Sequence, residues 1–220
     1  CAACLQGVDL GASRTQADYR KVGAEALRRA RVLVYPSAFM QRRFADFYPR
    51  RQAGQNEVVL APAAARTEVA PWPRDRANIA FVGGVYHHTG AALIAPTMDQ
   101  VRRRNKKAAG FVYGTGDPDL VQHLRKVKGL KVQGYYRAGT LATLFARDRI
   151  AVAVLPSIWP EPYGLVVDEC LAAGVPTVVF DLGAVADRLN FWEVGRVVRP
   201  QHGPPGIATA VFDAIGRSLT

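Results

Sequence analysis

The sequence predicts an α/β protein with a doubly wound parallel sheet, accompanied by a partial second α/β segment. From residue 77 onward, short apolar runs alternate with helical patterns, which is typical of strand–helix–strand units. Most of the runs contain consecutive apolar residues, as expected for parallel strands that are buried on both faces. Glycines close most of the runs, at 83, 84, 114, 116 and 134, at the strand ends where such sheets bind ligands.

Six strands and five helices are expected in the second part of the chain. The strand candidates are NIAFVGG (78–84), GFVYG (110–114), LKVQG (130–134), IAVAVLP (150–156), VPTVVF (175–180) and VGRVVRP (194–200). The helical patterns lie near residues 90–104, 117–126, 138–147, 164–173 and 205–218. No helix is expected between the last two strands.

The first part of the chain is organised differently. It has a helical pattern near 15–30, the strand RVLVYP (31–36), a helix near 38–47 and the strand EVVLAP (57–62). Pro71 and Pro73 exclude regular structure from the linker at 63–77. Since two strands cannot form an independent domain, residues 1–76 are expected to be the tail of another α/β domain, and 77–220 a domain of their own. A start without Met or a signal-like pattern suggests a sequence that begins inside a longer protein.

The composition is that of a globular protein, with 49% hydrophobic residues and no apolar run long enough to cross a bilayer. The formal net charge is +11, distributed as +6 over residues 1–76, +8 over 77–149 and −3 over 150–220. This charge favours anionic partners, such as phosphorylated ligands, lipid headgroups or nucleic acid, without choosing among them. Cys1 and Cys4 have no second pair to complete a metal site, and Cys170 is expected to pack as a small hydrophobe.

The segment IWPEPYGLVVDECLAAGVP (158–176) contains the most informative pattern. Pro162 favours an extended Glu161, and the apolar spacing predicts a helix from about Gly164 to Ala173. No Ser, Thr, Asp or Asn stands at the expected N-cap, so the first amide N–H groups lack a side-chain partner. Free N–H groups at the positive end of a helix dipole form a site for an anion such as phosphate, and a glycine there permits close approach.

Glu161 and Glu169 flank this helix start. Because carboxylates repel phosphate, their expected targets are neutral hydroxyl groups, which are good donors to carboxylates. The pattern therefore predicts a site for a sugar nucleotide, with its diphosphate at the helix start and its two sugars near the two glutamates. Asp168 is expected to face solvent.

These residues resemble a known family. EPYGLVVDECLAAGVP is similar to the E-x7-E segment of the retaining glycosyltransferases of family 4, which adopt the GT-B fold with two Rossmann-like domains. NIAFVGGVYHHTG, FVYGTGD, LKVQGYY and IAVAVLPSIWPEPYG resemble successive strands and turns of their C-terminal domain. ARVLVYPSAFMQRRFADFYP and NEVVLAP resemble the end of their N-terminal domain, so the resemblance covers nearly the whole chain.

The resemblance implies specific roles. Glu161 would contact the transferred sugar and Glu169 the donor ribose, and these two are the candidate catalytic residues. The candidate donor-binding residues are Gly83, Gly84, Thr89, Gly114, Thr115, Tyr136, Tyr163, Gly164 and Leu165. The resemblance also implies catalysis by stabilisation of the departing diphosphate, with no metal and no other cofactor.

Two positions depart from the family pattern. Gly84 stands where a basic residue is frequent, and Thr89 where a lysine is usual. His87, His88 or Arg137 are the candidates to replace the lost cation. Because the N-terminal domain is largely absent, the chain alone is expected to have no transferase turnover.

Three functions stay open at this point. The first is the donor-binding portion of a glycosyltransferase, with a nucleotide sugar, a saccharide or lipid-linked acceptor and the missing N-terminal domain as partners. The second is a noncatalytic GT-B-like scaffold domain with a degraded donor site. The third, a nucleic-acid-binding domain, is favoured by the charge alone. We expect a cytoplasmic protein, with peripheral association at the inner membrane face as an option, and unpaired strands in 1–76 that favour homo-oligomers.

Overall fold

The computed structural model describes residues 15–48, 55–63, 72–73, 77–192 and 195–217, which belong to two units, Cys1–Ala61 and Pro62–Thr220. Cys1, Cys4 and most of the expected linker lie outside the described residues.

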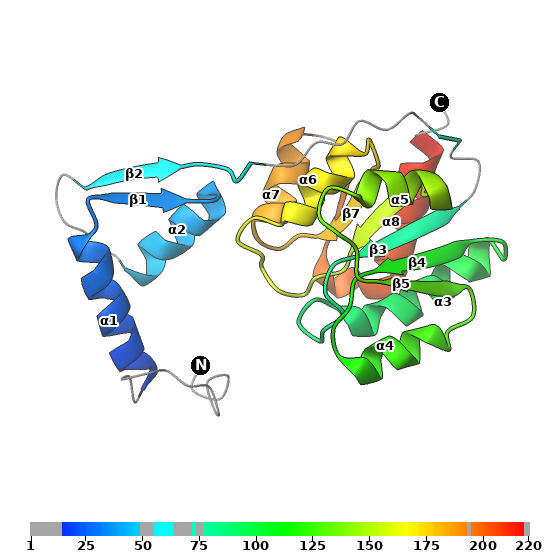
Figure 1. The fold of residues 1–220 in the computed structure, drawn as a ribbon, viewed down its shortest axis with the longest axis horizontal. Helices are drawn as coiled ribbons and strands as arrows, with labels where there is room; N and C mark the ends of the chain where they lie inside the picture. The colour runs from blue at the N-terminus through cyan, green and yellow to red at the C-terminus, as the bar shows by residue number, and fades with distance from the viewer. Residues whose placement is uncertain (1–14, 49–54, 64–71, 74–76, 193–194, 218–220) are drawn as a thin grey trace. The chain divides into compact units, whose positions relative to one another are not determined.

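A six-stranded sheet forms the centre of the second unit (Figure 1). Its strands lie in the order β5-β4-β3-β6-β7-β8, and every neighbouring pair is parallel. The strands are β3 (Asn78–Val82), β4 (Ala109–Tyr113), β5 (Leu130–Gly134), β6 (Val152–Leu155), β7 (Thr177–Phe180) and β8 (Gly195–Val198). The parallel sheet predicted from the apolar runs is confirmed.

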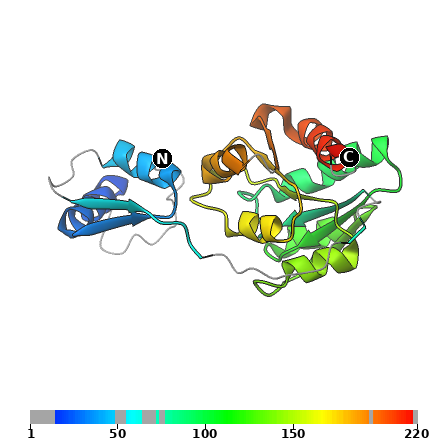
Figure 2. The same ribbon diagram turned by 90° about the horizontal axis from the view of Figure 1, so that it is seen from above.

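Helices cover both faces of this sheet, as Figure 2 shows from above. On one face lie α3 (Ile94–Arg104), α4 (Pro118–Arg125) and α8 (Gly203–Arg217), and on the other α5 (Leu141–Asp148), α6 (Leu165–Ala172) and α7 (Gly183–Trp192). Short 3-10 turns precede α3 (Ala91–Leu93) and α8 (Pro200–His202). Strand β3 supplies Ile79 and Phe81 to one hydrophobic core and Ala80 and Val82 to the other, which is why residues 79–82 are all apolar.

Helix α7 was not predicted from the sequence. It occupies the connection between β7 and β8, where no helix was expected. Val185 and Leu189 lie four residues apart and are buried in the core beneath α7. This spacing after Gly183 is the sequence signal for the helix.

The order of the strands places a topological switch point between β3 and β6. From β3 the chain moves through β4 and β5 toward one edge of the sheet, and then crosses to β6 on the other side of β3. Loops that follow strands on the two sides of such a point diverge and leave a crevice at the carboxyl ends. The loops after β3 and β6 are therefore the place where a ligand site is expected.

The first unit contains a parallel pair of strands, β1 (Val32–Tyr35) and β2 (Asn56–Val59). Two helices accompany them, α1 (Gln16–Arg29) and α2 (Ala38–Phe47), which begin at the N-cap residues Thr15 and Ser37. This is the partial α/β segment that the sequence predicted. Within the described ranges, none of the helices has the length and apolar character that a bilayer span requires.

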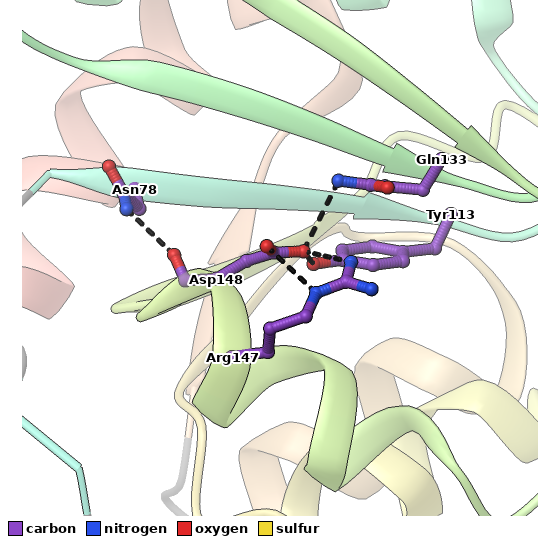
Figure 3. Close-up of polar contacts among 5 residues, drawn as sticks. All are labelled: Asn78, Tyr113, Gln133, Arg147 and Asp148. Carbon is purple, nitrogen blue, oxygen red and sulfur yellow. Dashed lines mark hydrogen bonds and ion pairs between the residues drawn. The ribbon is translucent and has the colours of Figure 1, made fainter.

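A partly buried polar network ties α5 to three strands (Figure 3). The hydroxyl group of Tyr113 donates to Asp148 Oδ2 at 2.7 Å, and Gln133 Nε2 donates to the same atom at 3.2 Å. Arg147 completes the carboxylate's partners, with Nε 3.1 Å from Oδ1. The side-chain amide of Asn78 donates from Nδ2 to the backbone carbonyl of Asp148 at 2.7 Å. The end of α5 is thereby joined to β3, β4 and β5.

Candidate functional site

A cavity of about 720 Å³ lies at the switch point, after the carboxyl ends of β3 and β6. Its lining residues are Val82, Gly83, Gly84, His88, Thr89, Leu155, Pro156, Ser157, Trp159, Glu161 and Val166. Four of the eleven residues predicted from the sequence, Gly83, Gly84, Thr89 and Glu161, thus line one cavity. The other seven lie outside its lining.

The start of α6 borders this cavity. Gly164 is the N-cap in the left-handed conformation, with φ 77° and ψ 74°, and no side-chain hydrogen bond caps the helix among the described residues. Val167 N donates to the Gly164 carbonyl at 3.0 Å, so the hydrogen bonds within the helix begin with the amide of Val167. Glu161 Oε2 lies 3.4 Å from the position that a Cβ on Gly164 would occupy. The uncapped helix start expected from the sequence is confirmed, and a carboxylate lies beside it.

The loop that contains Glu161 is held in place by the start of α7. A Cβ on Gly183 would lie 2.7 Å from the backbone nitrogen of Glu161, so only glycine permits this approach. The amide of Ala184 donates to the Glu161 carbonyl at 3.0 Å. The orientation of Glu161 therefore depends on a helix that the sequence did not predict.

Glu169 contacts the loop after β5. Its Oε1 accepts from the amide of Gly139 at 2.8 Å, and its Oε2 accepts from the Tyr136 hydroxyl at 3.2 Å. Burial, and then the neighbouring Glu169 carboxylate, raise the pKa of Tyr136, so the phenol keeps its proton and acts as the donor. Each carboxylate oxygen can accept a second hydrogen bond, so Glu169 retains capacity for a ligand hydroxyl. The structure thus brings together Tyr136, a candidate donor-binding residue, and Glu169, which the resemblance assigns to the donor ribose.

Asp168 does not face solvent, and this prediction from the sequence was wrong. Its side chain is 13% exposed and forms an ion pair with Arg188 of α7, whose side chain is 15% exposed. The same guanidinium donates to the carbonyls of Tyr163 at 2.9 Å and Gly164 at 3.2 Å, and lies 3.9 Å from the centre of the Tyr163 ring. Sequence reasoning missed Arg188 because its partners are 20 or more positions away and α7 was not predicted.

Thr89 has a structural role in the loop after β3. Its Oγ1 lies 2.5 Å from the Gly84 carbonyl and 2.9 Å from the Tyr86 carbonyl, and accepts from Tyr86 N at 3.0 Å. The hydroxyl group therefore closes the turn, and only a part of its hydrogen-bonding capacity is left for a ligand. The adjacent His88 stacks on Tyr86, with ring centres 5.6 Å apart.

Gly114, Thr115 and Leu165 were also expected in the donor site. The amide of Gly114 donates to the carbonyl of Gly134 at 2.8 Å, and the Thr115 carbonyl accepts from Val85 N at 3.1 Å. These bonds connect the turns after β3, β4 and β5. Leu165 is 57% exposed at the start of α6.

The described residues contain no group of three or more potential metal-ligating side chains. Cys170 is a free, fully buried thiol, and burial raises its pKa to about 12. A thiol of such high pKa is a poor nucleophile at neutral pH. Among the described residues, the cavity and its border provide the Glu161 carboxylate, the His88 imidazole, hydroxyl groups and the amides at the start of α6.

The chain is 30% identical over 142 residues, 62% of this chain and 35% of the relative, to an uncharacterized glycosyltransferase of Methanocaldococcus jannaschii. It is also 30% identical over 156 residues, 70% of this chain and 30% of the relative, to the D-inositol 3-phosphate glycosyltransferase 2 of Catenulispora acidiphila. The chain thus spans about a third of the length of these relatives.

A solved structure shows the same fold. The Anabaena protein HepE, in complex with UDP, superimposes with a TM-score of 0.74 at 16% identity, over 95% of this chain and 61% of that protein. The sequence profile of the family described as Glycosyl transferases group 1 matches residues 76–216, which include all six strands of the large sheet and the loops of the cavity. The chain belongs to the glycosyl transferases group 1 family.

Proposed function

We propose that the chain is the donor-binding portion of a retaining hexosyltransferase, which moves a sugar from a nucleotide diphosphate to a saccharide or lipid-linked acceptor. One observation carries the proposal: Glu161 lies beside the uncapped start of α6 at a cavity on the switch point of the sheet. The family membership and the UDP bound to HepE support a nucleotide sugar as the ligand. The protein would act in the cytoplasm or at the inner face of the membrane.

In this proposal, the amides of Gly164 and Leu165 hold the diphosphate. As the bond from the sugar carbon to the diphosphate oxygen breaks, negative charge grows on that oxygen. N–H groups at the positive end of a helix dipole stabilise this charge, and because they are already in place, no reorganisation is needed. Neither a metal nor another cofactor is required for this step.

The two glutamates would bind the two sugars of the donor. Glu161 accepts hydrogen bonds from the transferred sugar, and Glu169 from the ribose, with Tyr136 near the base. Gly83 and Gly84 leave room for the ligand at the end of β3. The turn residues Thr89, Gly114, Thr115 and Tyr163 shape the surrounding loops.

Residues 1–76 would belong to the acceptor-side domain. Because the chain spans about a third of its relatives, the remaining part of that domain would supply the acceptor site. We therefore expect the 220-residue chain to bind a donor without turnover.

Calorimetric titration of the chain with UDP, GDP and their glucose and mannose conjugates tests the proposal. Glu161→Gln is expected to weaken binding of the nucleotide sugar and to leave the free diphosphate nearly unaffected. Glu169→Gln is expected to weaken both, since the ribose is common to them. Asp213→Asn, which removes an equal charge from an exposed position on α8, is the matched control. If Glu161→Gln and the control lost equal affinity for the nucleotide sugar, the assignment of Glu161 to the transferred sugar would be contradicted.

A second candidate is a noncatalytic scaffold domain with the same fold. It is favoured by the cavity lining, which includes no Lys or Arg among the described residues, and by the engagement of the Thr89 hydroxyl within its own loop. This candidate predicts no binding of any nucleotide diphosphate by a chain that is otherwise folded.

A further inference from the structure

Arg188 contacts the α6 start from the side of α7. Its guanidinium donates to two consecutive backbone carbonyls, those of Tyr163 and Gly164, and pairs with the Asp168 carboxylate in the first turn of the same helix. The planar side chain also stacks on the Tyr163 ring. Five donors in a fixed plane allow one arginine to hold several acceptors at once, which a lysine cannot reproduce.

These contacts determine where the neighbouring amides point. In a trans peptide unit the C=O and N–H bonds lie in one plane and point in opposite directions. The Tyr163 carbonyl belongs to the same peptide unit as the Gly164 N–H, and the Gly164 carbonyl to the same unit as the Leu165 N–H. If Arg188 holds both carbonyls toward α7, both N–H groups must point away from α7.

The Arg188–Asp168 ion pair is largely buried. Both side chains are at most 15% exposed, so water screens neither charge well. The guanidinium pairs with the carboxylate at Oδ1, and the Tyr163 side chain also hydrogen-bonds to Asp168, so Arg188 supplies the positive charge that balances this carboxylate. Without Arg188, an uncompensated carboxylate would lie in the first helical turn, where it would repel an anion.

We propose that Arg188 is a positioning residue that directs the Gly164 and Leu165 amides at the donor diphosphate, with Asp168 as its counterion. Arg188 does not itself touch the ligand in this proposal. It acts through the backbone that it holds and by neutralising Asp168. The inference rests on the proposed donor site, and extends it to a cation on a helix outside the E-x7-E segment.

A purely structural ion pair would behave differently from a positioning residue. Its loss would lower stability and weaken every ligand of the cavity to a similar extent. Loss of the amide orientation would weaken only ligands that carry the diphosphate. The comparison of a nucleoside diphosphate with its nucleoside therefore separates the two roles.

The experiment measures the dissociation constants of UDP, uridine, GDP and guanosine by calorimetry on the 220-residue chain. We expect Arg188→Met to weaken the better-bound diphosphate by about tenfold or more, since charge-assisted hydrogen bonds are misdirected, and its nucleoside by less than about twofold. Arg188→Lys retains the positive charge but lacks the planar set of donors. We expect it to lower the affinity for the diphosphate several-fold and to leave the affinity for the nucleoside unchanged. Asp168→Asn keeps Arg188 in place and is expected to lose less affinity for the diphosphate than Arg188→Met.

Arg196→Met is the matched control, because Arg196 is also half-buried and donates to a backbone carbonyl, at 2.7 Å, but on β8. Circular dichroism verifies the fold of each variant, and Arg188→Lys decides the outcome if Arg188→Met does not fold. If Arg188→Met, or Arg188→Lys where the Met variant does not fold, bound the diphosphate with wild-type affinity, the inference alone would be overturned. The same holds if that variant lost equal affinity for the diphosphate and for the nucleoside. Failure of the unaltered chain to bind any of the four ligands would overturn the donor site and the inference together.

Discussion

Replacement of Tyr113 by Phe removes one oxygen atom from the polar network at the end of α5. The Tyr113 side chain is fully buried, and its hydroxyl group donates to the Asp148 carboxylate at 2.7 Å. A hydrogen bond to a charged group contributes about 1.5–3 kcal/mol. Asp148 keeps Arg147 and Gln133 as partners and its side chain is 14% exposed, so we expect the lower part of that range, about 1.5 kcal/mol.

The effect is expected to depend on pH. Burial alone would raise the pKa of Asp148, but the hydrogen bonds from Arg147 and Tyr113 outweigh it and lower the pKa below its usual value. A group whose pKa is lower in the folded state stabilises above its unfolded pKa, about 3.9 for Asp, and this stabilisation is lost as pH falls through the folded pKa. The difference between the unaltered chain and Tyr113→Phe should therefore be full at pH 7 and shrink below about pH 4.

Urea unfolding followed by tryptophan fluorescence measures this difference, because all three tryptophans lie in the unit Pro62–Thr220. Tyr135→Phe is the matched control, since Tyr135 is 79% exposed and its loss of a hydroxyl group should change the unfolding free energy by less than about 0.5 kcal/mol. A Tyr113→Phe variant as stable as this control at pH 7 would refute the contribution assigned to the network. A difference that stayed constant from pH 7 to pH 3 would refute the role of the ionised carboxylate.

Three further predictions concern other parts of the second unit. Trp72→Phe removes a hydrogen bond of 2.9 Å from the indole to a backbone carbonyl that precedes β6, and should lower the unfolding free energy by about 1–2 kcal/mol, whereas Trp159→Phe, at a side chain 55% exposed, should cost less. Gly164→Ala forces a left-handed φ of 77° on a residue with a Cβ, which would also lie 2.6 Å from Val185 Cγ2, so thermal unfolding should shift to lower temperature and UDP affinity should fall. In a variant whose other two cysteines are serine, Cys170 should resist a thiol reagent at pH 8 until urea is added, because it is fully buried with a pKa of about 12; rapid modification of the native chain would contradict its burial.

Much of the fold could be read from local patterns. Short runs rich in apolar residues predicted β3 to β8, and each of these segments contains a strand of the parallel sheet. The missing cap before Leu165 predicted an open helix start, and the structure has Gly164 there without a side-chain hydrogen bond from the described residues. These features depend on residues that are close in sequence, so a single sequence contains the necessary information.

The candidate site was predicted less completely. Glu161 and Glu169 were assigned to one ligand from their spacing, but the structure places Glu161 in the cavity lining and Glu169 against Tyr136 and Gly139. Asp168 was expected in solvent, although α7 covers it and supplies Arg188 as its partner. Spacing along a helix shows which direction a side chain takes, but not what another element places in front of it.

The sequence by itself determined the parallel α/β sheet, the uncapped start of the helix after β6 and the acidic residues beside it, because hydrophobic period and capping are properties of neighbouring residues. Only the tertiary structure decided which strands flank the switch point, that α7 covers Asp168, and that Arg188 holds the carbonyls at the α6 start. The physical reason is that these contacts join segments about 20 or more positions apart, whose meeting depends on how helices pack on a common sheet rather than on any local preference.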